Sequence, residues 1–235
     1  MLPHATARIR RLLGAAALVA VATLTAQASA AQATAPDPFD AALTLYVQGD
    51  LTGAAQAFGV LARQGHPGAM HDLAAMHLRG ELPDSSVQTA RELLLMAAQR
   101  GFVTSQYALG ELFESGRLGK QDLVQALAWY KLSAESGSLD GAVAAGTAYL
   151  MGRGTPADSS QAAQWYRQAA NGGEMGAMYI LASLYEKGDG VTQDLRLARY
   201  WYAGAAAAGD EAAPYKVKEL DARAAAEAAS APKSP

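Results

Sequence analysis

The sequence predicts an all-α protein, an α-solenoid of stacked antiparallel helix pairs with 36-residue repeats. Glycine, alanine and tryptophan each recur at that interval, and no insertion interrupts the register between Ala54 and Gly209. The recurring residues are Gly65, Gly101, Gly137, Gly173 and Gly209; Ala54, Ala90, Ala126, Ala162 and Ala198; and Trp129, Trp165 and Trp201. A unit of this length holds two helices that cannot bury their apolar faces alone, so neighbouring units must share one continuous core.

The first helix of each unit is expected to end at a glycine. One such helix places Ser105, Leu109 and Leu112 on a single face, which is the periodicity of a helix that packs on one side. Glycine is favoured after a helix because the residue there often adopts a left-handed conformation. The glycines at this position are Gly80, Gly116, Gly152 and Gly188.

The second helix of each unit is expected to begin at a capping side chain. The oxygen of such a side chain accepts hydrogen bonds from backbone N–H groups of the first turn, at about 1 kcal/mol each. The residues at this position are Ser86, Asp122, Asp158 and Asp194. The stripe that follows mixes small residues with aromatic rings, so Trp129, Trp165 and Trp201 are predicted to pack between helices rather than to stack on a ligand.

The ends of the chain are expected to differ from the repeats. Residues 1–30 are interpreted as a signal peptide, because Arg8, Arg10 and Arg11 precede an apolar run and Ala28-Ser29-Ala30 suits cleavage after Ala30. We expect a linker over 31–38, the solenoid over 39–222 and a disordered tail over 229–235. The units are expected near 39–65, 66–101, 102–137, 138–173 and 174–209, with a C-terminal capping helix over 212–228.

The net charge argues against nucleic-acid and membrane partners, and the absence of cysteine bears on how the fold is held together. Without the three arginines of the signal, the chain carries 16 basic and 22 acidic residues, a net charge of about −6. A nucleic-acid partner, or adhesion to an anionic membrane, would require a basic face. The apolar run near the start is shorter than the roughly 20 residues of a membrane span, so no stable span is expected after signal cleavage. The chain has no cysteine, and packing alone must hold it together.

One complete unit carries a family resemblance. It reads Gly141-x3-Ala145-Gly146-x2-Tyr149-x2-Gly152 and continues Asp158-x3-Ala162-x2-Trp165-Tyr166-x2-Ala169-Ala170-x2-Gly173. This pattern resembles the Sel1-like repeat, a relative of the tetratricopeptide repeat, and extends from about Ala69 to Asp210. The resemblance implies a solenoid with a curved inner surface that serves as a scaffold or adaptor, in exported bacterial members often for envelope regulation or host contact. A similar cysteine-rich subset is linked to penicillin hydrolysis, but this chain lacks the paired cysteines of that subset.

The sequence contains no recognisable catalytic motif. It has no His-Glu-x-x-His, no phosphate-binding loop and no Gly-x-Ser-x-Gly elbow. We therefore predict that the protein is not an enzyme and needs no cofactor. His66, His71 and His77 lie close in sequence, but their spacing suits a metal ion poorly, and no metal site is predicted. His77 holds the slot of Phe113, Tyr149 and Tyr185 in other units and is expected to face the core.

The candidate binding residues are positions of the first helices that face away from the apolar stripe and vary among units. Each unit contributes a trio at helical spacing, so each trio lies along one line. The residues predicted to bind a partner are His71, Leu78, Tyr107, Glu111, Glu114, Thr147, Tyr179, Ser183 and Glu186. Ala75, Val143 and Leu150 complete the lines. Tyrosine mixed with carboxylate suits a protein or peptide with basic and apolar groups, although these residues could instead pack against a neighbouring unit.

The favoured interpretation is a periplasmic or secreted interaction protein of the bacterial envelope, which binds a protein or peptide along the inner face of the solenoid. One alternative is an envelope hydrolase acting on cell-wall material or a β-lactam, which would need a nucleophile within reach of a base inside a cleft. A second alternative is a structural subunit of a larger envelope complex, bound permanently through one edge.

Overall fold

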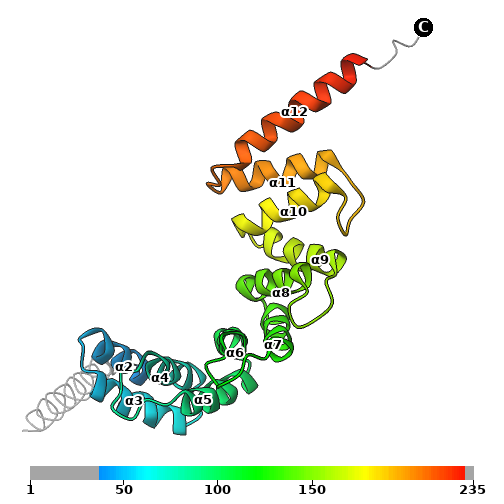
Figure 1. Ribbon diagram of the computed structural model, residues 1–235. Coiled ribbons are helices and arrows are strands. Elements are labelled where there is room, and N and C mark those ends of the chain that lie inside the picture. Colours follow the sequence, from blue (N-terminus) through cyan, green and yellow to red (C-terminus); the bar gives the residue numbers. More distant parts are fainter. Residues whose placement is uncertain (1–36, 231–235) are drawn as a thin grey trace, which may run out of the picture. The chain divides into compact units, whose positions relative to one another are not determined.

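The computed structural model describes residues 37–230, over which the chain is helical and contains no strand (Figure 1). The helices are α2 (Pro38–Val47), α3 (Leu51–Arg63), α4 (Pro67–Arg79), α5 (Val87–Gln99), α6 (Val103–Ser115), α7 (Leu123–Glu135), α8 (Leu139–Met151), α9 (Ser159–Asn171), α10 (Met175–Lys187), α11 (Leu195–Ala207) and α12 (Ala213–Ser230). The predicted signal peptide, nearly all of the predicted linker and residues 231–235 lie outside the described residues.

The chain divides into two units, Met1–Ala57 and Phe58–Pro235, which we describe separately. In the first unit, α2 begins at Pro38, one residue inside the segment predicted to be a linker. Asp37 explains the early start, because its Oδ1 accepts a hydrogen bond of 2.8 Å from the backbone N–H of Phe39. Proline is suited to the first helical position, where its missing N–H would have no partner within the helix.

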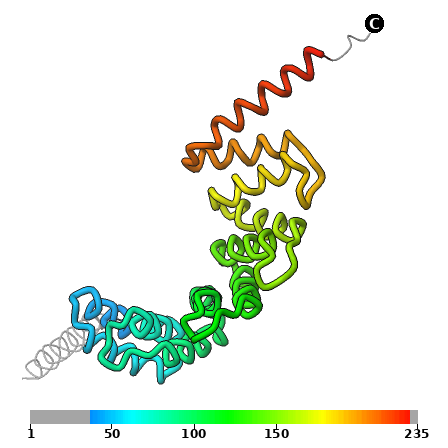
Figure 2. Tube along the Cα trace, viewed as in Figure 1, coloured from blue at the N-terminus to red at the C-terminus, as the bar shows by residue number. Residues whose placement is uncertain are grey.

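The second unit is a succession of antiparallel helix pairs (Figure 2). Helices pack within the pairs α4–α5, α6–α7, α8–α9 and α10–α11, and each second helix also contacts the first helix of the following pair. Helix α12 packs on α11 in the place where the next first helix would stand. The predicted all-α solenoid of stacked pairs is confirmed.

Both predicted helix boundaries are present. Each second helix begins at the expected N-cap; for example, Asp158 accepts hydrogen bonds from the N–H groups of Ser160 and Gln161, both at 3.0 Å. Gly80, Gly116, Gly152 and Gly188 follow the first helices with φ between 67° and 73°. A capping side chain therefore marks the start of each second helix, and a glycine in the left-handed conformation marks the end of each first helix.

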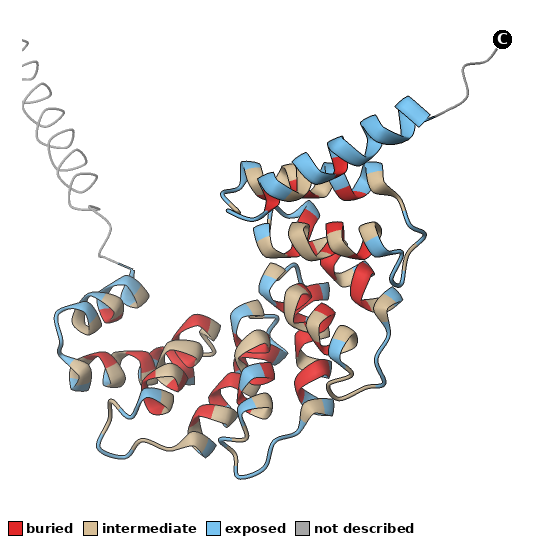
Figure 3. Ribbon diagram, turned by 45° about the horizontal axis from the view of Figure 1, so that its top comes forward, coloured by how far each residue is buried: buried red, intermediate tan, exposed pale blue. Residues whose placement is uncertain are grey.

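Buried residues lie along the seams between neighbouring helices (Figure 3). The core combines alanines with a tyrosine from successive second helices, and Tyr130, Tyr166 and Tyr202 are at most 4% exposed. The predicted packing role of the tryptophans is confirmed, because the half-buried side chains of Trp129, Trp165 and Trp201 pack against the core clusters. The rings fill space that the small residues leave between helices.

The C-terminal helix extends beyond its predicted end. Helix α12 continues to Ser230, so residues 229 and 230 are helical rather than part of a disordered tail. The last turns are rich in alanine, which has the highest helix propensity. Ala213 and Leu220 are its buried residues, and most of its other residues are exposed (Figure 3). None of the described helices combines the length and apolar character required to cross a bilayer.

Candidate partner-binding site

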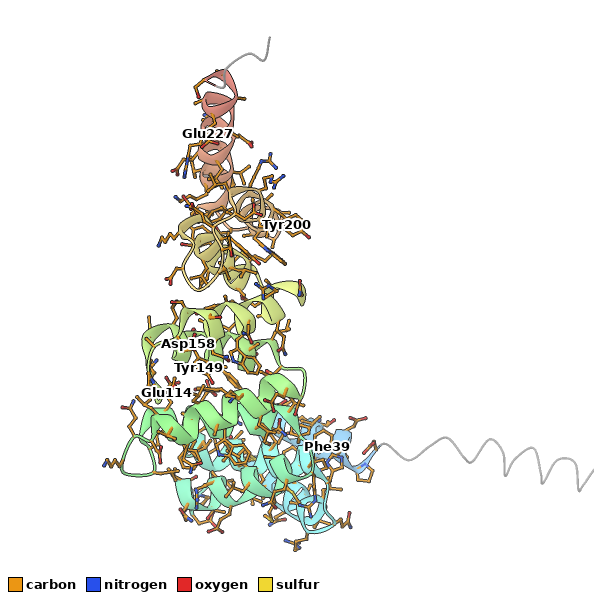
Figure 4. The ribbon with its side chains drawn as sticks, turned by 90° about the vertical axis from the view of Figure 1, so that its right-hand side faces the viewer. Phe39, Glu114, Tyr149, Asp158, Tyr200 and Glu227 are labelled. Carbon is orange, nitrogen blue, oxygen red and sulfur yellow. The ribbon has the colours of Figure 1, made fainter. Side chains whose placement is uncertain are left out.

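A pocket of about 220 Å³ opens where α6, α7 and α8 meet. Tyr107 and Glu114 line it from α6, and Thr147 lines it from α8. Three of the predicted binding residues therefore converge on one cavity. Glu114 is labelled in Figure 4, near the end of α6. The pocket also contains side chains that the sequence prediction left out, chiefly Asp140, Ala144 and Arg153.

Two side chains hold the Glu114 carboxylate in place. The hydroxyl of Tyr130 on α7 donates a hydrogen bond of 2.5 Å to Oε2, and the Arg153 guanidinium, just after α8, lies 2.6 Å from Oε1. The Glu114 side chain is 29% exposed. Burial and the hydrogen bond to Glu114 raise the pKa of Tyr130, so this hydroxyl remains a donor at physiological pH. One carboxylate of α6 thus links to α7 and to the loop after α8.

The pocket is electronegative. Its lining holds the carboxylates of Glu114, Asp140 and Glu174 against the single guanidinium of Arg153. Burial, assisted by the nearby carboxylates of Glu111 and Asp140, raises the pKa of Tyr107 to about 12. The pKa of Glu111 is also raised, mainly by burial and further by the charges of Glu114 and Asp140. Such surroundings favour a ligand with positive charge.

A second cluster of the same design lies between α10, α11 and α12. Tyr202 donates a hydrogen bond of 2.8 Å to Oε2 of Glu186, and the Lys216 ammonium of α12 lies 3.3 Å from Oε1. Arg223 lies 3.8 Å from the same Oε1. The rings of Tyr179 and Tyr202 meet edge to face at 5.0 Å. The Glu186 side chain is only 12% exposed, so this predicted binding residue is already held inside the molecule.

The unit between these clusters uses a different polar contact. Thr147 donates a hydrogen bond of 2.8 Å to the carbonyl of Val143. Its hydroxyl oxygen also lies 2.9 Å from the Tyr166 hydroxyl, which must act as the donor because the threonine hydrogen is already engaged. Leu150 holds the glutamate slot in this unit, and Thr147 provides the partner for the buried tyrosine instead.

In the earliest complete pair of the second unit, His71 makes the polar contact to the following pair. Its Nδ1 lies 3.0 Å from the hydroxyl of Ser105, and its ring packs 5.5 Å from that of Phe102. Burial lowers the pKa of His71. Arg117 donates a hydrogen bond to the backbone carbonyl of Leu78. Leu78 is the residue of this unit that corresponds to Glu114 in the next.

The pairing of Ser105 with His71 bears on the hydrolase alternative. A serine near an imidazole is the geometry of an activated nucleophile, but Ser105 is fully buried. A substrate could not reach its hydroxyl in this conformation, so we interpret the contact as a link between neighbouring pairs. Across residues 37–230, no three histidine or carboxylate side chains converge in a way that could hold a metal ion.

The predicted binding residues do not form a single open surface. Tyr107, Glu114 and Thr147 share the pocket, whereas Tyr179, Ser183 and Glu186 surround Tyr202, and His71 and Leu78 contact the following pair. Glu111 is exposed and the other eight are half-buried. The sequence prediction did not include Arg153, although the sequence contains a signal for it. An arginine follows the same first-helix position by 39 residues in two units: Arg117 follows Leu78, and Arg153 follows Glu114.

Comparisons with known proteins agree with this architecture. The family model of the Sel1 repeat matches residues 67–102, 103–138, 140–174 and 176–210. The chain is similar to a solved protective antigen of uropathogenic Escherichia coli that displays an SLR fold, with 26% identity and a TM-score of 0.71 over 78% of this chain. It is also similar to a solved Sel1 repeat protein from Oxalobacter formigenes, with 32% identity and a TM-score of 0.65 over 71% of this chain.

These two structures are longer than the present chain, which covers 40% of the first and 49% of the second. A comparison with curated proteins finds no match. The four matched repeats nevertheless account for more than half of the 235 residues and coincide with the helix pairs from α4 to α11. The protein therefore belongs to the Sel1 repeat family.

Proposed function

We propose that the protein is a non-enzymatic interaction module of the bacterial cell envelope, which holds a segment of a partner protein against the pocket between α6, α7 and α8. Proteins built from Sel1 repeats typically take part in protein–protein interactions. The observation that carries the proposal is the pocket itself, because three predicted binding residues line it beside an aromatic ring and an excess of carboxylates.

Rigid presentation is the mechanism. Side-chain caps at α7 and α9, and the contact of buried Tyr130 with Glu114 of α6, hold these helices before a partner arrives, so few groups of this chain need to be ordered on binding. A preordered surface lowers the entropic cost of association. The partner is expected to supply basic and apolar side chains, which would meet the carboxylates and the ring of Tyr107.

An envelope location is part of the proposal. The interpretation of residues 1–30 as a signal peptide supports it. A further support is that the similar Escherichia coli protein is described as a protective antigen, a description that fits an exported protein. A fractionation of cells that express the full chain, followed by sequencing of the mature N-terminus, should find residue 31 first; a chain that retains residue 1 in the cytoplasm would contradict this part.

The binding function is tested by capture from an envelope extract with the immobilised full chain. A triple variant of residues that line the pocket, Tyr107→Ala, Asp140→Asn and Thr147→Val, should lose proteins that the parent chain retains, while its helical circular dichroism persists. The matched control is Tyr200→Ala, because Tyr200 is 63% exposed on α11 and lies outside the pocket (Figure 4). The control should retain the same proteins. Equal capture by the triple variant would refute the proposed surface.

A further inference from the structure

The two tyrosine–glutamate clusters are copies of one design, two repeats apart. Tyr107 corresponds to Tyr179, Tyr130 to Tyr202 and Glu114 to Glu186, each at a separation of 72 residues. In both copies the tyrosine hydroxyl of the second helix donates to Oε2 of the glutamate. Each copy can therefore serve as a guide to what occupies the other.

The later copy contains its own cationic occupant. Lys216 of α12 places Nζ 3.3 Å from Oε1 of Glu186, and Oε2 of Glu219 lies 3.1 Å from the same ammonium. Arg223 adds a second cation 3.8 Å from that Oε1. A single carboxylate oxygen of Glu186 thus accepts contacts from two positively charged side chains.

The earlier copy lacks this lysine. The residue equivalent to Lys216 is Ala144 on α8, and Ala144 lines the pocket beside Glu114. Arg153 approaches Oε1 of Glu114 from the loop after α8, where the later copy has Ala225. Because Ala144 forms part of the pocket wall, a longer side chain at this position would extend into the pocket.

We propose that this pocket takes the side chain of a lysine from the partner polypeptide, which extends the proposed function and depends on it. The ammonium would bind Oε1 of Glu114 as Lys216 binds Glu186, with Asp140 and Glu174 balancing the added charge. The methylene stem would lie against the ring of Tyr107 and the apolar wall formed by Leu127, Val143 and Ala148. Lysine suits such a site because its long apolar stem can be buried while its charged end is paired.

The test titrates the full chain with Nα-acetyl-lysine N-methylamide and follows its backbone amide resonances by NMR. Saturable shifts are expected at Tyr107, Thr147 and Arg153. The norleucine analogue has a similar stem without the ammonium. Its affinity should be lower by at least about ten-fold, because it lacks the charged hydrogen bond. Equal binding of the two compounds would overturn the proposal.

Two variants make the test independent of folding defects. Ala144→Lys should fill the pocket with the chain's own ammonium and abolish the shifts, since the equivalent lysine is tolerated in the later copy. Lys216→Ala should open the later copy and add a second set of shifts around Tyr179. Persistent lysine binding in folded Ala144→Lys would refute the assignment of the pocket.

The outcome separates this inference from the proposed function. If lysine fails to bind while partner capture still depends on Tyr107, the inference is wrong and the binding function stands. If lysine binds but the triple variant captures the same proteins as the parent chain, the pocket is a lysine site and the proposed function is wrong.

Discussion

At the scale of single residues, packing in the second unit depends on which first-helix residue contacts each buried tyrosine. Gly110 lets the ring of Tyr130 lie directly on the backbone of α6, whereas Gly146 leaves slightly more room for Tyr166. The next first helix has Ala182 in this slot, facing Tyr202. The size of this one residue therefore limits how closely the tyrosine ring of the second helix can lie on the first helix of its pair.

Gly110→Ala should destabilise the protein by about 1–3 kcal/mol, because overpacking a close helix contact costs that much. A methyl group there would overlap Cδ1 and Cε1 of Tyr130 and push the hydroxyl away from Glu114. Gly146→Ala is the matched control, since its nearest ring atoms would lie at 3.2 Å. Urea unfolding checks the comparison; equal midpoints for the two variants would show that the Tyr130 contact is not tight.

Tyr202→Phe should cost about 1–3 kcal/mol of unfolding free energy, because Glu186 would lose a donor while its carboxylate stays largely buried. Tyr200→Phe, two residues earlier on the same helix, is the control, since Tyr200 is 63% exposed. Thermal unfolding measures both. An unchanged melting temperature for Tyr202→Phe would mean that Lys216 and Arg223 alone satisfy the carboxylate.

His71 should make stability depend on pH. Burial lowers its pKa in the folded state below the ordinary value of 6.5, so the folded protein binds this proton less strongly than the unfolded chain. The stabilising contribution is complete above pH 6.5 and decreases as the pH falls towards the lowered pKa. Asp72 and Arg79 act on the same ring, the first raising and the second lowering its pKa.

The check on this pH dependence is a set of urea midpoints measured between about pH 5 and pH 8. His71→Gln keeps a polar group near Ser105 but does not titrate, so its midpoint should fall less than that of the parent chain as the pH decreases. Identical slopes for the two proteins would assign the acid sensitivity to other groups.

At the scale of helices and loops, glycines join one pair to the next. Gly154 has φ of 76° and packs its backbone against the start of α7. Gly190 repeats this contact one unit later, against the start of α9. The loops after α8 and α10 thus lock onto the preceding pair, which places Arg153 where it can reach Glu114.

Gly154→Ala should destabilise the junction between the pairs α6–α7 and α8–α9. A Cβ atom there would overlap the carbonyl of Leu123, and backbone atoms cannot move aside as side chains can. Gly137→Ala is the control, because its φ is also positive but nothing lies within 4 Å of its Cβ position. Hydrogen exchange should show faster exchange in α7 and α8 for Gly154→Ala alone; equal protection in both variants would contradict this role of the loop.

At the scale of the whole molecule, the sequence predicts those features of the structure that depend on nearby residues or on the strict 36-residue repeat. Helix ends were predictable because Asp158 and Gly152 act within one turn, and the core was predictable because Tyr166 and its equivalents follow the 36-residue register. The pocket was only partly predictable. Its walls depend on how far α8 stands from α6 and on a small residue, Ala144, whose importance appears only by comparison with Lys216.

The central claim is that the pocket beside Glu114 holds a partner. Its most direct test changes Ala144 to lysine and measures how much protein the full chain then retains from an envelope extract. We predict that Ala144→Lys folds with unchanged helical circular dichroism and loses the proteins that both the parent chain and Tyr200→Ala retain. Retention of the same proteins in the same amounts by folded Ala144→Lys would contradict the claim.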